Sequence, residues 1–174
     1  RTLISRLGYR NDGMHPGGRR LVFVGDLTDR GPHSLAVVRF VQGCVIKGHA
    51  QCILGNHDLN ILLGKRKYDN SWFFGDKFYD TSGTLIEQEL AGEADRASIV
   101  EFFSTLPLAL EGPGVRVAHA FWDDEAINQL RHRTDARRVY NENVERIQHL
   151  ADAANLSPIA RELAEQNDNP IKLI

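Results

Sequence analysis

The chain has 174 residues, of which 42% are hydrophobic and 25% are charged, and its formal net charge is −2. This length and apolar content can support one sizeable hydrophobic core, and the nearly balanced charge gives no strong sign of a nucleic-acid or membrane surface. No apolar run is long enough to span a bilayer, and no charged-then-apolar leader is found. We therefore expect a reducing, cytoplasmic location and no membrane partner.

Two smaller features have plain structural explanations. Cys44 lies in an apolar helix pattern and Cys52 in an apolar strand, so both are expected to be buried thiols rather than parts of a disulfide or a metal site. Basic residues cluster at 65–67 and at 131–138, but acidic residues lie close to both clusters, which is typical of a solvated face.

The first third of the chain predicts two strands joined by a helix. Apolar residues at helical spacing over 3–7 predict a short opening helix, and turns follow at 11–18. Apolar runs at 21–24 and 50–54 predict buried strands, and an apolar stripe over 35–45 predicts a helix between them. Together these elements form a βαβ unit, whose loops meet at the same edge of a sheet.

The rest of the chain is predicted to be mixed at first and helical at the end. Residues 59–80 predict a short helix and then an irregular insertion, and a further helix is expected over 99–106. Residues 108–118 predict an antiparallel hairpin. An amphipathic helix is expected over 140–154, and a second one beginning at 157, where serine suits the N-cap and proline follows it.

Three of the predicted strands end beside residues that could bind a metal ion. In an open α/β sheet, ligands gather beyond the carboxyl ends of the strands, so we expect these residues to converge on one crevice. Their composition is typical of a metal-assisted phosphoester hydrolase. The strand ends supply Asp26, Asn56 and His119, and the loops place Asp29, Arg30 and His57 beside them.

Each of these residue types suits a part of phosphoester hydrolysis. Two metal ions about 3.5–4 Å apart can bind a hydroxide and the phosphate oxygens, and the carboxylate of Asp26 is a natural bridge between them. With the amide oxygen of Asn56 and the imidazole of His119, the ligand set mixes oxygen and nitrogen, which suits Mn, Fe or Zn. Arg30 offers a planar, bidentate clamp for phosphate that lysine would not reproduce.

The segments GDLTDRG at 25–31 and GNHD at 55–58 resemble the calcineurin-like metallophosphoesterases. Within that superfamily they resemble the PPP group of phosphoprotein phosphatases and symmetrical dinucleoside-tetraphosphatase-like enzymes, over roughly residues 1–122. The resemblance implies an α/β fold with a metallo-dependent phosphatase-like β-sandwich core flanked by helices, and a mostly helical C-terminal part. We expect one domain over 1–174, with the metal-site loops in a core at 1–122 and a helical cap or packing region at 123–174.

The same resemblance implies two divalent transition metal ions, Mn by preference with Fe or Zn as alternatives, and no organic cofactor. It assigns Asp26, Asn56 and His119 to the second metal, and it points His57 toward the leaving group as the general acid. A carboxylate hydrogen-bonded to that imidazole would favour the protonated ring and fix which nitrogen faces the substrate, which gives Asp29 its role.

Two parts of the family pattern are missing. No D-x-H precedes Asp26, and no Gly-His pair follows His119. We expect a chain truncated at both ends, so that this part alone is inactive, and the alternative is a non-catalytic relative that acts as a binding module. A plain α/β nucleotide-binding domain is a third candidate, but no glycine-rich phosphate loop of that kind is present.

The sequence leaves the substrate class open. The expected partner is a phosphorylated substrate, which is a phosphoprotein Ser/Thr, a dinucleoside polyphosphate or another small phosphoester. Phe121 and Trp122 follow the His119-Ala120 step. They are expected to anchor the helical half in the core, and stacking on a nucleobase is the alternative.

Overall fold

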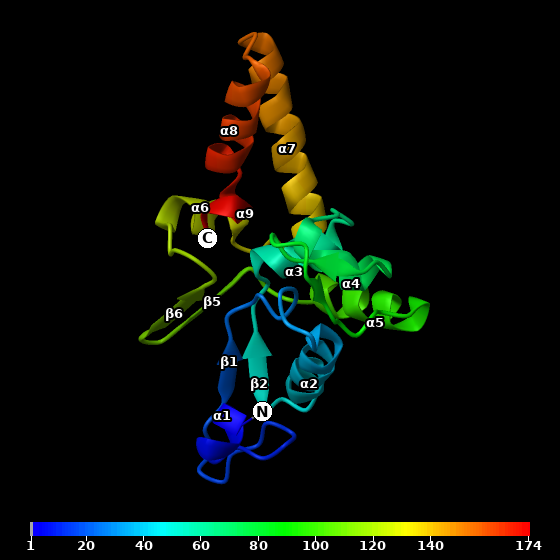
Figure 1. Ribbon diagram of the computed structural model, residues 1–174. Coiled ribbons are helices and arrows are strands. Elements are labelled where there is room, and N and C mark those ends of the chain that lie inside the picture. The colour runs from blue at the N-terminus through cyan, green and yellow to red at the C-terminus, as the bar shows by residue number, and fades with distance from the viewer. Residues whose placement is uncertain (1) are drawn as a thin grey trace. The chain divides into compact units, whose positions relative to one another are not determined.

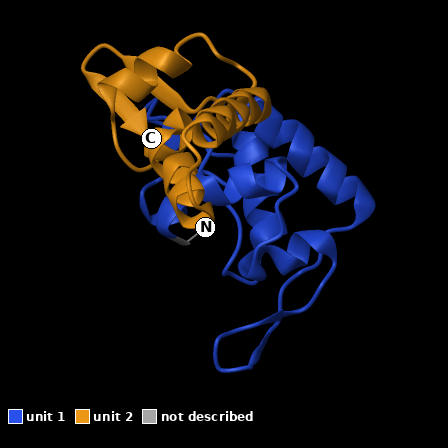
Figure 2. Ribbon diagram, turned by 90° about the horizontal axis from the view of Figure 1, so that it is seen from above, with its two compact units in different colours: residues 1–106 blue, residues 107–174 orange. Residues whose placement is uncertain are grey.

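The structure, a computed structural model, describes residues 2–174 and divides into two compact units, residues 1–106 and residues 107–174 (Figure 2). Both units contain helices and strands, and this mixed content fits an α/β protein. Among the described residues, each sheet has two strands. No helix in residues 2–174 is both long enough and apolar enough to cross a membrane.

The first unit alternates strands and helices, and Figure 1 labels its helices α1 to α5 and its strands β1 and β2. Its helices and strands are α1 (Thr2–Arg6), β1 (Leu21–Phe23), α2 (Ser34–Ile46), β2 (Ala50–Cys52), α3 (Asn56–Leu62), η1 (Tyr68–Asn70), α4 (Ser71–Phe74), β3 (Phe78–Tyr79), β4 (Leu85–Ile86) and α5 (Glu93–Ser104).

The predicted βαβ unit is present. It places the two motif segments, residues 25–31 and 55–58, at one edge of the sheet, and we call these segments the signature loops. Strands β1 and β2 are parallel, with Leu21 paired to Ala50 and Phe23 to Cys52. Helix α2 connects them and buries the predicted apolar stripe, and Gly48, with φ of +70°, follows its last turn. Because the strands run in the same direction, the loops after both of them emerge on the same side.

The core of the first unit is formed by apolar faces of α2, α3 and α5. Helix α5 contacts both of the others, and it begins earlier than predicted because Gly92 serves as its N-cap, with Asp95 accepting a hydrogen bond from the Gly92 N–H. The irregular insertion predicted within residues 59–80 contains η1, α4 and β3, and β3 pairs with β4 just beyond it in a short hairpin. The most deeply buried side chains of the core include Val38, Val41, Ile53, Ile61, Leu62, Trp72 and Phe103.

The second unit opens with the predicted hairpin and continues with helices. Strands β5 (Ala109–Gly112) and β6 (Val115–Ala118) are antiparallel. They are followed by α6 (Asp124–Leu130), α7 (Ala136–Ala153), α8 (Pro158–Asp168) and α9 (Pro170–Leu173). Figure 1 shows α7 and α8 lying side by side. The side chains that cap these four helices are Asp123, Asp135, Ser157 and Asn169.

One expectation about the second unit is wrong. Phe121 is 66% exposed, so it does not anchor a core. Trp122 is half-buried, and its indole N–H donates to the carboxylate of Asp124 at 3.0 Å, while the guanidinium of Arg116 lies 5.0 Å from its ring centre. The sequence pattern showed only that aromatic residues adjoin a strand, and that is compatible with either face of a hairpin.

Candidate active site

The loops that follow β1 and β2 touch through two glycines. A Cβ atom on Gly55 would lie 2.3 Å from the amide nitrogen of Asp26, and one on Gly25 would lie 2.4 Å from the amide nitrogen of Gly55. Gly25 also has a φ of +86°. Neither position accepts a larger residue unless the backbone moves. The contact sets Asp26 beside the start of α3, where the N–H of His57 donates to Asp26 Oδ1 at 3.1 Å.

The loop after β1 holds three non-glycine residues in the left-handed backbone region. The φ angles are 51° at Asp26, 73° at Asp29 and 55° at Arg30. Side chains with a Cβ lose roughly 1–2 kcal/mol each in this conformation, and it persists only where the surroundings enforce it, which is common at active sites and ligand clamps. The strain in this loop therefore marks it as a candidate site independently of the sequence motif.

Asp58, the last residue of the GNHD segment, ties the two loops together. Its side chain is fully buried, and it accepts hydrogen bonds from the N–H of Leu27, the hydroxyl of Thr28 and the N–H of Gly55 at 3.0, 3.2 and 3.1 Å. Burial raises the pKa of this carboxyl to about 7, because removal from water disfavours its charged form. The role of Asp58 is to hold both loops at a fixed separation.

His57 and Asp29 form the hydrogen bond that the sequence predicted between them. Nδ1 of His57 lies 2.7 Å from Oδ2 of Asp29, and the two side chains are 12% and 1% exposed. The other carboxylate oxygen, Oδ1, accepts the indole N–H of Trp72 at 2.8 Å. Burial raises the pKa of Asp29, while the hydrogen bonds from Trp72 and His57 act in the opposite direction. Both oxygens of this buried carboxylate are therefore engaged.

Arg30 lies on the other side of the imidazole. Its Nη2 is 3.3 Å from Nε2 of His57, and its Nε is 3.6 Å from a carboxylate oxygen of Asp69. A guanidinium can only donate, so in this contact Nε2 is the acceptor and the ring proton is on Nδ1, directed at Asp29. The Arg30 side chain is 75% exposed, which leaves its remaining donors open to solvent or to an anion.

The comparison with known protein families agrees with these motifs. The family model for calcineurin-like phosphoesterases matches residues 5–170. The chain belongs to this family. The resemblance drawn from GDLTDRG and GNHD is thereby confirmed, and membership of the calcineurin-like family implies divalent metal ions.

Three curated relatives of this calcineurin-like chain are bis(5'-nucleosyl)-tetraphosphatases by name. It is 57% identical over 58 residues to the asymmetrical bis(5'-nucleosyl)-tetraphosphatase PrpE of Halalkalibacterium halodurans, which covers 32% of this chain and 24% of that protein. It is 35% identical over 130 residues to PrpE of Anoxybacillus flavithermus, covering 68% and 50%. It is 38% identical over 109 residues to the symmetrical bis(5'-nucleosyl)-tetraphosphatase of Aromatoleum aromaticum, covering 62% and 36%.

The matched segments thus span between a quarter and a half of the length of these three relatives. No solved structure matches the chain significantly.

The donor set at the loop tips fits a divalent metal ion. Asp26 offers a carboxylate in the loop after β1 and Asn56 offers an amide oxygen at the start of α3, and both residues are exposed. These oxygen donors suit divalent ions such as Mn. A second group, formed by Asp29, His57 and Asp69, offers ligand atoms within 4.8 Å of one another. A metal ion in that second group would take the His57 nitrogen that now donates to Asp29.

The structure brings together five of the six predicted site residues and places the sixth in the other unit. In the first unit, Asp26, Asp29 and Arg30 lie in the loop after β1, and Asn56 and His57 are the first two residues of α3, directly after the loop that touches it. His119 follows β6 in the second unit, directly after a strand as predicted. Its convergence with Asp26 and Asn56 stays a prediction.

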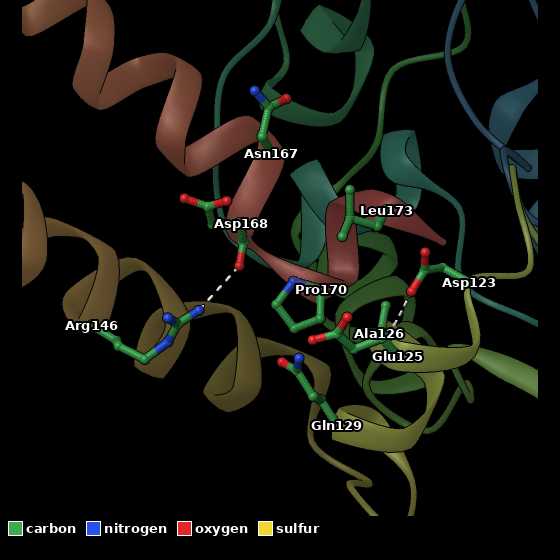
Figure 3. A pocket seen from close by; sticks show the side chains of 9 residues that line it. All are labelled: Asp123, Glu125, Ala126, Gln129, Arg146, Asn167, Asp168, Pro170 and Leu173. Carbon is green, nitrogen blue, oxygen red and sulfur yellow. Dashed lines mark hydrogen bonds between the residues drawn. The ribbon is translucent and has the colours of Figure 1, made fainter.

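The second unit has a polar pocket of its own, which Figure 3 shows from close by. Its lining includes Asp123, whose carboxylate accepts the Ala126 N–H at 2.7 Å, and Arg146, which donates to the backbone oxygen of Asp168 at 3.1 Å. These contacts cap the ends of helices α6 and α8. None of the predicted site residues lines this pocket.

Sequence reasoning missed two residues of the site, Asp69 and Trp72. Both lie in the segment that was predicted to be irregular, and both are buried beside the His57–Asp29 pair. The available signal was weak: a buried tryptophan needs an acceptor for its indole N–H, but its place in the chain does not say which acceptor. Trp72 is 43 residues from Asp29 in sequence, and no motif spacing connects them.

Proposed function

We propose that the full-length protein is a metal-dependent hydrolase that cleaves phosphoester or phosphoanhydride bonds in nucleotide-type substrates. The observation that carries this proposal is the buried 2.7 Å hydrogen bond between His57 and Asp29, located inside the two signature loops of the family. The nucleotide class is supported by the relatives, which are bis(5'-nucleosyl)-tetraphosphatases. A phosphoprotein substrate ranks second, because these named relatives act on dinucleoside tetraphosphates.

We infer that Asp26 and Asn56, together with His119, would hold one of two metal ions. The exposed carboxylate and amide oxygens at adjoining loop tips support this assignment. Mn is the preferred ion, with Fe or Zn as alternatives, because the proposed ligands mix oxygen and nitrogen. When bound, the metal ions would supply an activated water and neutralise charge on the phosphate.

His57 is the proposed general acid, and the geometry gives its neighbours separate tasks. Asp29 accepts the Nδ1 proton of the ring, so any second proton must go to Nε2, the nitrogen that faces Arg30. Arg30 is the proposed phosphate clamp. When its guanidinium turns to a phosphate, Nε2 loses the donor that now points at it and becomes free to carry a proton to the leaving oxygen. The buried carboxylate of Asp29 stabilises the imidazolium in that state.

For the whole fold we propose the family arrangement, in which the sheets described here belong to a β-sandwich core flanked by helices. The helices after residue 123 would serve as a cap or packing region. Two further expectations also stay predictions: one domain over residues 1–174 whose core ends at residue 122, and a cytoplasmic location.

The test is a His57→Ala variant of the full-length protein, with a bis(5'-nucleosyl) tetraphosphate as substrate. We expect turnover to fall by about 10²–10⁴, which is the usual contribution of a general acid, while the metal content measured by elemental analysis stays unchanged. Asn56→Ala and His119→Ala should instead lower the metal content. A His57→Ala protein that loses its metal ions but keeps its activity per metal would contradict the assigned role.

The same substrate also separates the proposed hydrolase from the non-catalytic alternative. A binding module would hold a nucleotide without releasing a product, whereas the proposed hydrolase releases mononucleotides in proportion to its metal content. If full-length, metal-loaded protein binds the tetraphosphate and cleaves neither it nor an aryl phosphate, the enzyme proposal fails.

A further inference from the structure

Trp72 is a completely buried side chain with a single polar atom, and that atom is bonded to Asp29. Its exposed fraction is 0%, and its indole nitrogen lies 2.8 Å from Oδ1 of Asp29. An indole nitrogen only donates, and a buried donor without an acceptor costs about 1–3 kcal/mol. The hydrogen bond therefore gives the indole N–H its acceptor, and it uses the carboxylate oxygen of Asp29 that does not contact His57.

The position of Trp72 is fixed by its own segment rather than by the loop that carries Asp29. The backbone oxygen of Trp72 accepts the N–H of Ala91 at 2.9 Å. The fully buried side chain of Asn70 closes the turn before α4, accepting the Lys67 N–H at 2.9 Å and donating to the Lys65 oxygen at 3.0 Å. The indole is thus a preformed donor, to which the Asp29 carboxylate must adapt.

A second carboxylate competes for the imidazole. Nδ1 of His57 lies 2.7 Å from Asp29, but only 3.7 Å from Oδ2 of Asp69, which is also buried. A rotation of the ring toward Asp69 would move Nδ1 away from Asp29, and a rotation of the Asp29 carboxylate that withdraws Oδ2 would leave Asp69 as the nearby acceptor. The indole N–H holds Oδ1 of Asp29 in place, so it favours the rotamer in which Oδ2 points at His57.

We propose that Trp72 is a positioning residue for the general acid: by fixing the Asp29 carboxylate, it selects Asp29 over Asp69 as the partner of His57. This inference rests on the proposed function. It also gives the segment between residue 58 and the start of α5 a part in the reaction, although that segment contains none of the family's motif residues.

The kinetic test uses full-length Trp72→Phe, Asp29→Asn and the double variant, each assayed on two substrates. One substrate is a bis(5'-nucleosyl) tetraphosphate, whose leaving group benefits from a proton, and the other is p-nitrophenyl phosphate, whose leaving group does not. We expect Trp72→Phe to lower kcat on the first substrate by about 10- to 100-fold, by analogy with residues that orient a metal ligand through a hydrogen bond, with KM unchanged and little loss on the second. The double variant should lose no more than Asp29→Asn alone.

Two control variants separate this role from packing. Trp122→Phe also removes an indole–carboxylate hydrogen bond, but its acceptor Asp124 is exposed on the surface, and the change should leave the ratio of the two activities unchanged. Phe73→Leu removes a ring that packs edge-on against Trp72 at 5.8 Å. It should lower the stability and leave the same ratio unchanged.

A spectroscopic measurement tests the hydrogen bond between Trp72 and Asp29 without an activity assay. In ¹⁵N-labelled protein, the indole N–H resonance of Trp72 should move upfield in Asp29→Asn, because an amide oxygen is a weaker acceptor than a carboxylate, and the resonance of Trp122 should stay in place. If Trp72→Phe fails to fold, this measurement decides, and an unmoved Trp72 resonance overturns the proposal.

The kinetic outcomes distinguish this inference from the function on which it rests. Equal losses of Trp72→Phe on both substrates, or wild-type behaviour on both, overturn the positioning role when Asp29→Asn shows the substrate dependence. If Asp29→Asn itself shows no substrate dependence, the proposed general acid fails, and the role of Trp72 fails with it.

Discussion

Gly55 lies so close to Asp26 that one added carbon on Gly55 would be 2.3 Å from the Asp26 amide nitrogen. The two signature loops therefore meet backbone to backbone, and the side chains of Asp26 and His57 are placed by that contact. Because the spacing leaves no room for a Cβ, it can be tested by adding one.

Gly55→Ala should destabilise the fold by about 1–3 kcal/mol, the usual cost of overpacking, and should lower metal affinity because Asp26 shifts. Thermal unfolding and metal titration measure the two effects. Gly43→Ala is the matched control: it lies within α2, a Cβ there meets nothing within 4 Å, and alanine should stabilise the helix by about 0.5–1 kcal/mol. Equal stability of the two variants would show that the loops are not in contact.

Asp58 should make the stability of the metal-free protein depend on pH. Burial raises its pKa from 3.8 to about 7, so between these values the folded state binds more protons than the unfolded state. The stabilising contribution is fully present below about pH 4 and is lost as the pH rises through 7. Unfolding by denaturant at several pH values, in the presence of a chelator, should show this fall.

Asp58→Asn should remove that pH dependence and destabilise the protein throughout. One of the two polar side-chain atoms would become an amide nitrogen facing a backbone donor, either the N–H of Gly55 or that of Leu27, and an unsatisfied buried donor costs about 1–3 kcal/mol. If the Asp58→Asn variant kept an unchanged fall in stability between pH 4 and 7, the titration would belong to another group.

Arg30→Lys should reduce kcat/KM of the full-length protein by at least about tenfold while the fold stays intact. The guanidinium reaches His57 and Asp69 from different nitrogens, and a lysine ammonium is a single point charge that cannot reproduce this fork. Arg39→Lys is the control, because Arg39 makes ion pairs with Asp95 and Glu89 on exposed surface. Identical losses in both variants would mean that charge, and not geometry, matters at Arg30.

Both cysteines should be unreactive in the native state. Cys44 and Cys52 are 1% and 2% exposed, and burial raises both thiol pKa values, that of Cys52 to about 12. Since the thiolate is the reactive form, a thiol-specific reagent at pH 8 should label neither group until denaturant is added, and then both. Rapid labelling without denaturant would contradict the burial of these side chains.

The sequence was sufficient wherever local pattern and motif order decide the outcome. The strands before Asp26 and Asn56 follow from short apolar runs, and their parallel pairing follows from the helix between them, so the meeting of the two loops could be predicted. The hydrogen bond from His57 to Asp29 could be expected as well, because the family resemblance made His57 the general acid with Asp29 as its carboxylate, and the strand pairing brings their segments together.

Other features depend on tertiary packing that no periodicity encodes. Trp72 reaches Asp29 across 43 residues through a segment of short turns, and the sequence pattern there predicted only a short helix followed by an irregular insertion. The same holds for Phe121, whose apolar ring suggested a core position although it is 66% exposed. An aromatic residue beside a strand can lie on either face, and only the folded chain selects one.

The bond between Trp72 and Asp29 also limits how such a protein can be recombined with its relatives. The two signature loops cannot be transferred alone with all their hydrogen bonds. The indole N–H that donates to Asp29 belongs to Trp72 in α4, outside both loops. A chimera that exchanges residues 65–74 replaces that donor even when GDLTDRG and GNHD are left untouched. The residues that must be exchanged together are therefore more than the two sequence motifs, and they extend at least to α4.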